Sequence, residues 1–348
     1  MVKLEATSEI IEVLKNWQTI VKEYQTPNTK KAVIQIFNSF LPFIGIWALM
    51  YWMLGQFSYW LILPLAVLNS FFLVRIFIIQ HDCGHQSFLK SRKWNNAIGF
   101  ICSFISLIPY RYWARSHDFH HAHNGMLEIG IRDIGDVDLF TVEEYRALSP
   151  KKQFKYRVYR SPLVMFLLGP LYYLLVHNRF AIIKKKGWDA ARRSLRWSNF
   201  FILCFYVGMS LLLGWKNFLL IQVPIVVFFA VIAIWFFYVQ HQHKDGYKQW
   251  EENWEYLLSA IRGSSYYKLP KMMQWLTGNI GIHHIHHLSS QIPNYNLERC
   301  NTENPILEKY VTVLTFRSSL KCIFNKLWDE DGERMISFGE YEQLFGDR

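Results

Sequence analysis

Histidines carry the clearest chemical pattern in this chain, because 12 of its 13 histidines fall in four short clusters and only His177 stands alone. Two of the clusters, HDFHH and HHIHH, contain histidines spaced i, i+3 and i+4. At this histidine content an HxxHH pattern is expected by chance roughly 0.02 times per chain, so two occurrences indicate a functional site. The clustered histidines are His81, His85, His117, His120, His121, His123, His241, His243, His283, His284, His286 and His287.

Metal binding is the chemistry that this pattern favours, because imidazole is a neutral ligand for borderline metals. The i, i+3, i+4 spacing is expected to aim three rings of one helix at one point. Zinc fits poorly, since a zinc site closes with four ligands or with three and a water. Eight or nine convergent histidines can instead supply two ions of higher coordination number. We therefore predict two iron ions that activate oxygen, with no catalytic residue separate from the metal ligands.

The elements that must position these histidines are predicted to be membrane helices. Hydrophobic residues make up 51% and aromatic residues 17% of the chain, which is too apolar for an ordinary soluble domain and excludes a disordered chain. We predict an all-α membrane protein with a single domain over residues 1–348. It has two transmembrane hairpins, interfacial helices and a cytosolic helical cap that carries the diiron site. The segments long enough to cross about 30 Å of hydrocarbon are residues 33–54, 59–80, 197–213 and 218–240.

The charge pattern predicts which side of the membrane the histidines occupy. The linkers inside the two hairpins, residues 55–58 and 214–217, contain one positive residue, Lys216, and every other Lys and Arg except Arg75 lies on the opposite side. The positive-inside rule then predicts a plasma membrane protein whose termini and histidine clusters are cytoplasmic. The net charge of +11 suits anionic lipid, and no nucleic-acid partner is expected. Arg75, inside the second span, is expected to extend to the interface.

The remaining segments are predicted to be shorter elements. Residues 97–110 and 162–176 are below spanning length and are predicted to be interfacial or re-entrant helices. Residues 1–32 contain apolar positions at helical spacing, which predict a helix that either lies on the membrane surface or packs on the cytosolic cap. The cap itself is expected to comprise residues 81–196 and 241–348, with loops and short helices.

The chain resembles the membrane histidine-box fatty acid desaturases through HDCGHQSF, HDFHH and GNIGIHHIHHLSSQIPNYNL, whose order and spacing fit that family. The resemblance extends to FYVQHQHKDGY, GSSYYKLPKMMQWLTGNIG, TVEEY and LWDEDGERMISF, and is greatest to the bacterial acyl-lipid Delta5 desaturases. It implies two non-haem irons, O2 as co-substrate, and a cis double bond formed in a membrane phospholipid acyl chain, for unsaturated fatty acid synthesis and membrane fluidity. It also implies ferredoxin or flavodoxin as the electron donor.

The resemblance further implies which residues bind the metal. A ninth ligand is expected just after the last span, where His241 matches the family better than His243. Asp82 and Asp118 could accept hydrogen bonds from ligand N–H groups or serve as caps, and Asn279 could orient a ligand or form a turn. The eight box ligands are His81, His85, His117, His120, His121, His283, His286 and His287, and the supporting or alternative candidates are His243, His284, His123, Asn279, Asp82 and Asp118.

Two rival functions remain open at this point. A membrane diiron lipid or alkane hydroxylase could use a similar histidine scaffold and would yield an alcohol in place of an alkene. A non-catalytic metal transporter or haem-binding membrane protein is the alternative from another class. Transporters place polar groups near the middle of the membrane, whereas the histidines here lie at the ends of the predicted spans, and a haem protein would show a Soret band.

Overall fold

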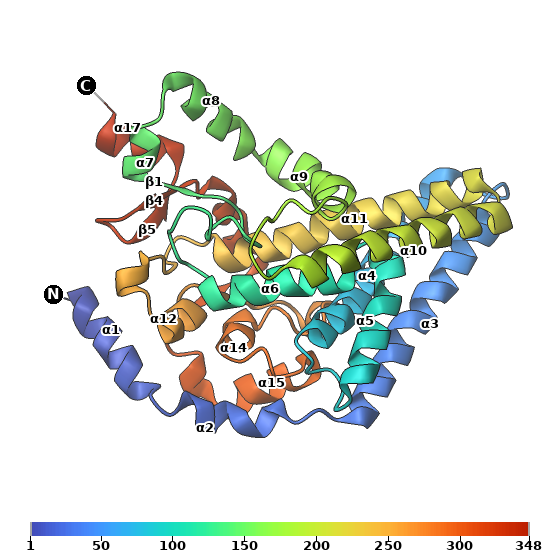
Figure 1. Ribbon diagram of the computed structural model, residues 1–348, viewed down its shortest axis with the longest axis horizontal. Coiled ribbons are helices and arrows are strands. Elements are labelled where there is room, and N and C mark those ends of the chain that lie inside the picture. The colour runs from blue at the N-terminus through green and yellow to red at the C-terminus, as the bar shows by residue number, and fades with distance from the viewer. Residues whose placement is uncertain (1, 347–348) are drawn as a thin grey trace.

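The computed structural model describes residues 2–346, with side chains from residue 8 onward, and it is almost entirely helical. Within these residues four helices are long and apolar enough to cross a membrane, or up to six spans if each of two bent helix pairs crosses it. The long helices form the two predicted hairpins (Figure 1), which confirms the predicted fold class. They are α3 Thr29–Met53, α4 Ile62–Gly84, α10 Asp189–Leu213 and α11 Trp215–His241.

Helix α4 is the centre of the helical bundle and packs against α3, α5 and α11. Helix α10 lies at the edge, and its side chains Leu203, Leu211 and Leu212 are 62%, 82% and 77% exposed. Apolar side chains on α3 and α11 are exposed in the same way, among them Leu41 and Val223. A continuous apolar surface of this kind requires a non-aqueous surrounding, so these faces are the ones that contact lipid.

Two bent helix pairs connect the bundle to the cap. Helix α5 (Arg92–Ser106) meets α6 (Tyr110–His123) at a bend of 100°, and α8 (Pro150–Tyr159) meets the segment Val164–His177, which contains α9 (Gly169–Tyr172), at a bend of 53°. The first bend forms because Leu107 adopts a left-handed conformation (φ 60°) and Pro109 follows it. These features end one helix and start the next, so α6 leaves the bundle and runs toward the cap.

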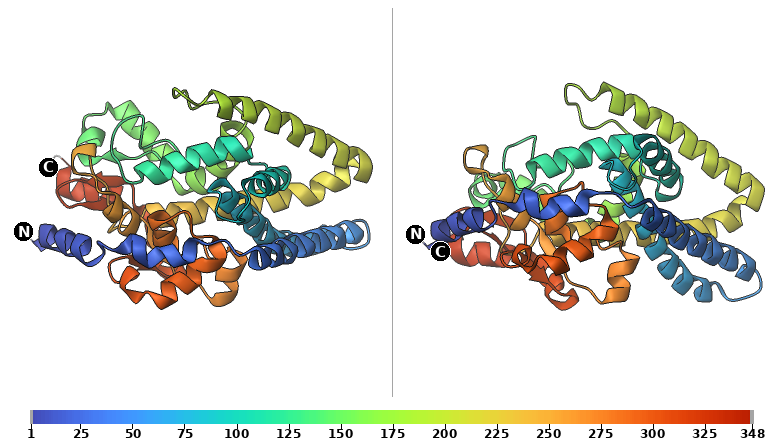
Figure 2. Two further views of the ribbon diagram at one scale, coloured as in Figure 1. Left: turned by 60° about the horizontal axis from the view of Figure 1, so that its bottom comes forward. Right: turned by 90° about the horizontal axis from the view of Figure 1, so that it is seen from below.

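The cap is assembled from short helices and two small sheets. Strand β4 pairs in parallel with β1 and antiparallel with β5, and β2 pairs in parallel with β3. In Figures 1 and 2 both α1 and α17 lie at the cap end, opposite the hairpin tips. The helices are α1 Val2–Val13, α2 Trp17–Lys22, α7 Val142–Arg146, α12 Tyr256–Ile261, α13 Lys271–Leu276, α14 His283–Leu288, α15 Asn294–Glu303, α16 Phe316–Ser319 and α17 Phe338–Phe345. The strands are β1 Phe140–Thr141, β2 Ser265–Tyr267, β3 Thr312–Leu314, β4 Leu327–Asp329 and β5 Arg334–Ile336.

The N-terminal helices pack on this cap. Ile10, Leu14 and Val21 are buried in one apolar cluster with residues of α12, α14 and α15. The Tyr24 hydroxyl also donates a hydrogen bond to Glu303 of α15 (2.6 Å). Of the two interpretations of this segment, the structure supports the helix that packs on the cap.

The prediction for Arg75 is wrong. Its side chain is 5% exposed and does not extend to the interface. The guanidinium lies 4.0 Å from the centre of the Trp275 ring and donates hydrogen bonds to the Trp275 carbonyl and to Asn38 Oδ1. The physical reason is that a cation–π contact and carbonyl acceptors inside the protein replace the water that it would otherwise seek.

The contact between α5 and α6 leaves no room for a side chain at Gly99. An added Cβ would overlap the ring of Tyr110, which is 2% exposed and cannot move aside. We expect Gly99→Ala to destabilise the protein by about 1–3 kcal/mol through overpacking. Thermal unfolding in detergent measures the effect, with Gly208→Ala of α10 as control, because a Cβ there meets nothing within 4 Å. Equal melting temperatures for the two variants would contradict the prediction.

Candidate metal centre

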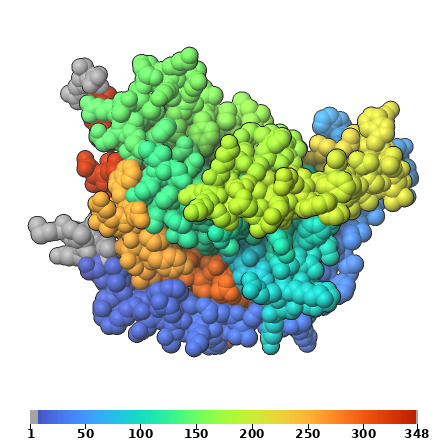
Figure 3. All heavy atoms as spheres, in the orientation of Figure 1, coloured from blue at the N-terminus to red at the C-terminus, as the bar shows by residue number. Residues whose placement is uncertain are grey.

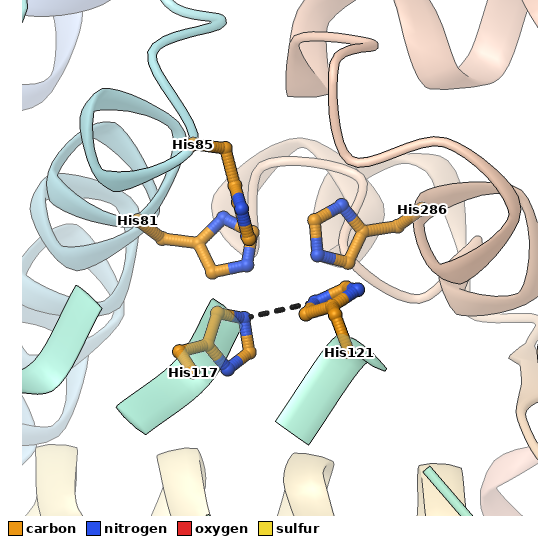
Figure 4. A group of neighbouring side chains, drawn as sticks. All are labelled: His81, His85, His117, His121 and His286. Atoms are coloured by element: carbon orange, nitrogen blue, oxygen red, sulfur yellow. Dashed lines mark hydrogen bonds between the residues drawn. The ribbon is translucent and has the colours of Figure 1, made fainter. Parts of the chain in front are cut away.

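Nine histidines converge in two buried clusters between the ends of α4 and α11 and the helices α6 and α14. In the first cluster five histidines offer ring nitrogens that all lie within 4.8 Å of one another, and Figure 4 shows these rings pointing toward a common centre. In the second cluster three histidines meet the same condition, and the Nε2 of a fourth, His283, lies 2.9 Å from that of His241. The first cluster contains His81, His85, His117, His121 and His286, and the second contains His120, His241, His287 and His283.

The two clusters share helices and touch each other. The rings of His121 and His287 are stacked with centroids 4.1 Å apart. The prediction that each HxxHH box aims its rings at one point is wrong, because each box divides between the clusters. Residues at i+3 and i+4 differ by about 100° around a helix, so His120 turns toward one cluster while His121 turns toward the other.

The donor set fits metal ions. His286 is 1% exposed, and neither of its ring nitrogens has a hydrogen-bond partner. In the second cluster the Nε2 atoms of His120 and His283 lie 3.2 and 2.9 Å from the Nε2 of His241. Buried nitrogen atoms without a partner, such as those of His286, are costly, whereas neutral imidazoles around a cation are a stable arrangement. The residues present therefore suit two ions held mainly by nitrogen.

Two glutamines that the sequence analysis did not single out connect the ends of two spans to the loops before α6 and α14. Gln80 and Gln240 each directly precede a cluster histidine at the end of a span, and both are buried. The Gln80 amide donates to the Ile108 carbonyl before α6, and the Gln240 amide donates to the Ile280 carbonyl before α14, each at 2.8 Å. The end of each span is thus joined to the loop that starts a histidine box. Their signal in the sequence is a polar residue at the end of an apolar helix, next to a histidine.

Asp82 supports His81 from outside the first cluster. Its Oδ1 lies 2.9 Å from Nδ1 of His81, and its Oδ2 accepts hydrogen bonds from the backbone and side-chain nitrogens of Asn294 at 2.6 and 2.7 Å. Asn294 in turn accepts a hydrogen bond from Gln35 of α3. A carboxylate on Nδ1 orients the imidazole and leaves Nε2 for a metal. Asn294 and Gln35 were missed by the sequence analysis.

The other supporting candidates lie in different surroundings. Asp118 Oδ1 is 3.2 Å from His85 Nδ1, but its side chain is 48% exposed. His243 and His284 are buried outside both clusters, and His123 stacks on Phe119 with centroids 4.0 Å apart. Asn279 has a φ of 57° in the turn before α14, and its amide donates to the Asn294 carbonyl. This conformation suits a turn residue, and its role toward a metal ligand stays a prediction.

The histidines of α14 predict a pH effect on the metal-free protein. Burial, and then the neighbouring histidines, hold the pKa of His286 and of His287 well below their ordinary value of 6.5. The unfolded chain therefore binds more protons below pH 6.5, and the free energy of unfolding falls as the pH decreases through this range. We expect chelator-treated protein in detergent to melt at a lower temperature at pH 5 than at pH 8. A melting temperature that stays level or rises on acidification would contradict this.

The fold and the site together define a helical membrane protein with a polyhistidine metal site. A family model described as "Fatty acid desaturase" matches residues 58–318. The "Fatty acid desaturase" of Bacillus subtilis (strain 168) is 45% identical over 322 residues, which cover 91% of this chain and 89% of that protein. The chain therefore belongs to the membrane fatty acid desaturase family, and it is an oxidoreductase that desaturates fatty acids.

Two further relatives carry more specific names. The "sn-1 acyl-lipid omega-3 desaturase (ferredoxin)" of Nostoc sp. (strain 36) is 27% identical over 87% of this chain and 82% of that protein. The "sn-1 oleoyl-lipid 12-desaturase" of Anabaena variabilis is 25% identical over 80% of this chain and 78% of that protein. Both names describe desaturases that act on fatty acyl groups in lipids.

Proposed function

We propose that this protein introduces a cis double bond, at the Delta5 position, into an acyl chain of a membrane phospholipid. The observation that carries the proposal is the pair of histidine clusters at the ends of α4 and α11, where apolar spans meet the cap. The spans that end at the clusters are apolar, which suits a substrate that enters from the bilayer. The acyl-lipid names of the two cyanobacterial relatives support a lipid substrate, and the motif resemblance supports the Delta5 position.

The reaction balances with an external donor. Two C–H bonds of neighbouring methylenes break and a C=C bond forms, which releases two electrons and two protons. Two more electrons from the donor and two protons from solvent complete the reduction of O2 to two waters. Two irons bound by the nine clustered histidines would supply the oxidising power that breaks unactivated C–H bonds. A ferredoxin or flavodoxin is the proposed donor, and the ferredoxin in the printed name of the Nostoc relative supports this choice.

The side chains next to the clusters suit a hydrocarbon. Trp113 stacks on His117 with centroids 4.6 Å apart and lies 5.8 Å from His81. Phe77 packs edge-on against Trp113 at 5.0 Å and against Phe229 at 5.7 Å. This aromatic layer excludes water from the bundle side of the first cluster. The position of the acyl chain relative to the histidines then decides which methylenes react, which is catalysis by orientation.

In the proposed orientation the protein lies in the plasma membrane, with the cap, the clusters and both termini on the cytoplasmic side. Both α1 and α17 lie at the cap end (Figure 1), and the two hairpin linkers at the other end contain a single basic residue, Lys216. The positive-inside rule supports this orientation. It also gives a cytoplasmic electron donor direct access to the cap.

Fatty acid analysis of a bacterial host tests the proposal. The chain is expressed with a ferredoxin, and membrane fatty acids are measured by gas chromatography and mass spectrometry after derivatisation that locates double bonds. A new cis-monoene at Delta5 in the phospholipid fraction is the expected result. A monoene at another carbon would refute the position, and a hydroxylated chain without an alkene would favour the hydroxylase.

A further inference from the structure

A groove of about 570 Å³ lies outside the metal centre, between α5, the start of α6 and the first turns of α10. Figure 3 shows α10, in yellow-green, directly beside α5, in cyan. The groove sits where α10 leaves the cap and enters the bundle, which is the level of the membrane surface in the proposed orientation. Its volume lies within the range of pockets that bind small molecules. It is lined by Asn96, Ala97, Phe100, Tyr110, Arg111, Ala190, Arg193, Ser194 and Trp197.

The groove is positively charged. Arg111 and Arg193 line it, and no Asp or Glu is among its lining residues. Among the side chains described, no carboxylate lies within ion-pair distance of either guanidinium. The nearby Asp189 forms its ion pair with Arg192 and attracts Arg193 only over a longer distance. Two unpaired arginines in one groove favour an anion with several oxygen acceptors, and a phosphate fits this description.

An aromatic stripe continues from the groove along the bundle. On α10, Arg193, Trp197, Phe201 and Phe205 recur every four residues and therefore share one face. The steps are about 6 Å each, and the order is a cation, then tryptophan, then phenylalanine. This is the order of headgroup, interface and hydrocarbon in a bilayer. Trp197 is 62% exposed.

Helix α5 provides the facing wall of the same stripe. The ring of Phe100 lies 6.0 Å from that of Phe201, and the ring of Phe104 lies 5.5 Å from that of Phe205. These contacts close the space between the two helices below the groove. The exposed ring of Trp197 therefore lies on the side of the groove that faces lipid in the proposed orientation.

The inner wall of the groove connects it to the metal centre. Tyr110 is 2% exposed, and its hydroxyl donates to the Cys83 carbonyl at 2.6 Å. Cys83 lies within the first histidine box, between two ligands of the first cluster. Tyr110 thus joins the inner wall of the groove to the turn of α4 that carries two histidines of the first cluster.

We propose that this groove binds the phosphodiester headgroup of the phospholipid substrate, with the phosphate between Arg111 and Arg193. This inference rests on the proposed function, because it names the headgroup class of the same lipid substrate. The aromatic stripe favours a membrane lipid as the bound molecule, since free phosphate has no acyl chain to contact Trp197 and Phe201. Specificity for phospholipid over uncharged glycolipid follows from the two arginines.

Steady-state kinetics in lipid nanodiscs test the groove, with reduced ferredoxin as donor. The substrates are dipalmitoylphosphatidylglycerol and a monogalactosyldiacylglycerol with the same acyl chains. For the double variant Arg111→Gln, Arg193→Gln we expect the KM for phosphatidylglycerol, expressed as its surface mole fraction, to rise at least tenfold. We expect kcat to stay unchanged. With the galactolipid we expect neither KM nor kcat to change. Arg196→Gln is the matched control, because it removes the same charge from α10 outside the groove and is expected to behave as wild type. Identical kinetics for the double variant and Arg196→Gln would overturn the proposal.

Native mass spectrometry separates failure of the groove from failure of the proposed function. Wild-type protein is expected to retain phosphatidylglycerol, and the double variant to lose it. If this difference appears but wild type desaturates no phospholipid, the proposed function fails and with it the assignment of the headgroup to a substrate. If millimolar glycerol 3-phosphate displaces the lipid completely, the groove recognises phosphate alone and the proposal of a lipid site is overturned.

Discussion

His286→Ala is expected to abolish desaturation and to remove at least one of the two proposed irons, while the protein stays folded and in the membrane. The ring of His286 lies close to histidines of both α4 and α6. Its centroid is 4.4 Å from that of His81 on α4 and 4.6 Å from that of His121 on α6. Both of its nitrogens lack any other partner. Alanine would therefore remove a metal ligand without breaking a hydrogen bond of the fold.

Iron content per protein, by elemental analysis, and turnover of phospholipid measure this effect together. His123→Ala is the control, since His123 lies on α6 within the HDFHHAH stretch but outside both clusters. We expect the control to bind two irons and to retain activity. Wild-type iron content and turnover in His286→Ala would refute the role of His286 as a ligand.

Asp82→Asn is expected to lower iron affinity and activity by about 10- to 100-fold. The carboxylate accepts hydrogen bonds on both oxygens, and its side chain is 2% exposed, so no water can replace it. An amide keeps the size but presents N–H to one of its two donors, His81 or Asn294. Either the imidazole loses its orientation or the first residue of α15 loses its anchor. Asp82 acts here through His81 as a positioning residue.

Titration of metal-free protein with Fe(II) distinguishes this role from a general loss of stability. Asp118→Asn is the matched variant, because Asp118 also lies beside a cluster histidine but is half exposed. Water can take its place, so we expect a change of less than about threefold. Equal losses of iron affinity in the two variants, or an unchanged affinity in Asp82→Asn, would contradict the positioning role.

Periodicity and residue type were sufficient to predict the long helices and the convergence of the histidines. Four apolar segments and the i, i+3, i+4 spacing are local patterns, and local patterns can be found in one sequence. Helical geometry separates the i+3 histidine of each box from the other two, but which cluster each histidine joins depends on where α4 and α11 approach α6 and α14. The same holds for the contact of Asp82 with Asn294, which are 212 residues apart.

The small sheets and the surroundings of Arg75 were missed for a related reason. Strands of two or three residues are too short to show a period. Strands β1 and β4 are also far apart in the sequence, since Phe140 pairs with Leu327. The acceptors of Arg75 are Asn38 and the carbonyl of Trp275, which belong to other elements. Because the sequence does not show these partners, Arg75 was expected to extend to the interface. Sequence patterns identify which residues do chemistry here, and long-range packing decides how they are grouped.

The division of α6 and α14 between the two clusters has a consequence for how the enzyme acquires iron. An ion in either cluster holds both helices in place, so part of the ordering that the other cluster requires is already complete. We expect the two binding events to be linked, and a linkage of this kind is reciprocal. If the shared ordering outweighs the repulsion between the two cations, protein with a single ion is scarce, and the metal supply sets how many molecules work and not how fast each one works.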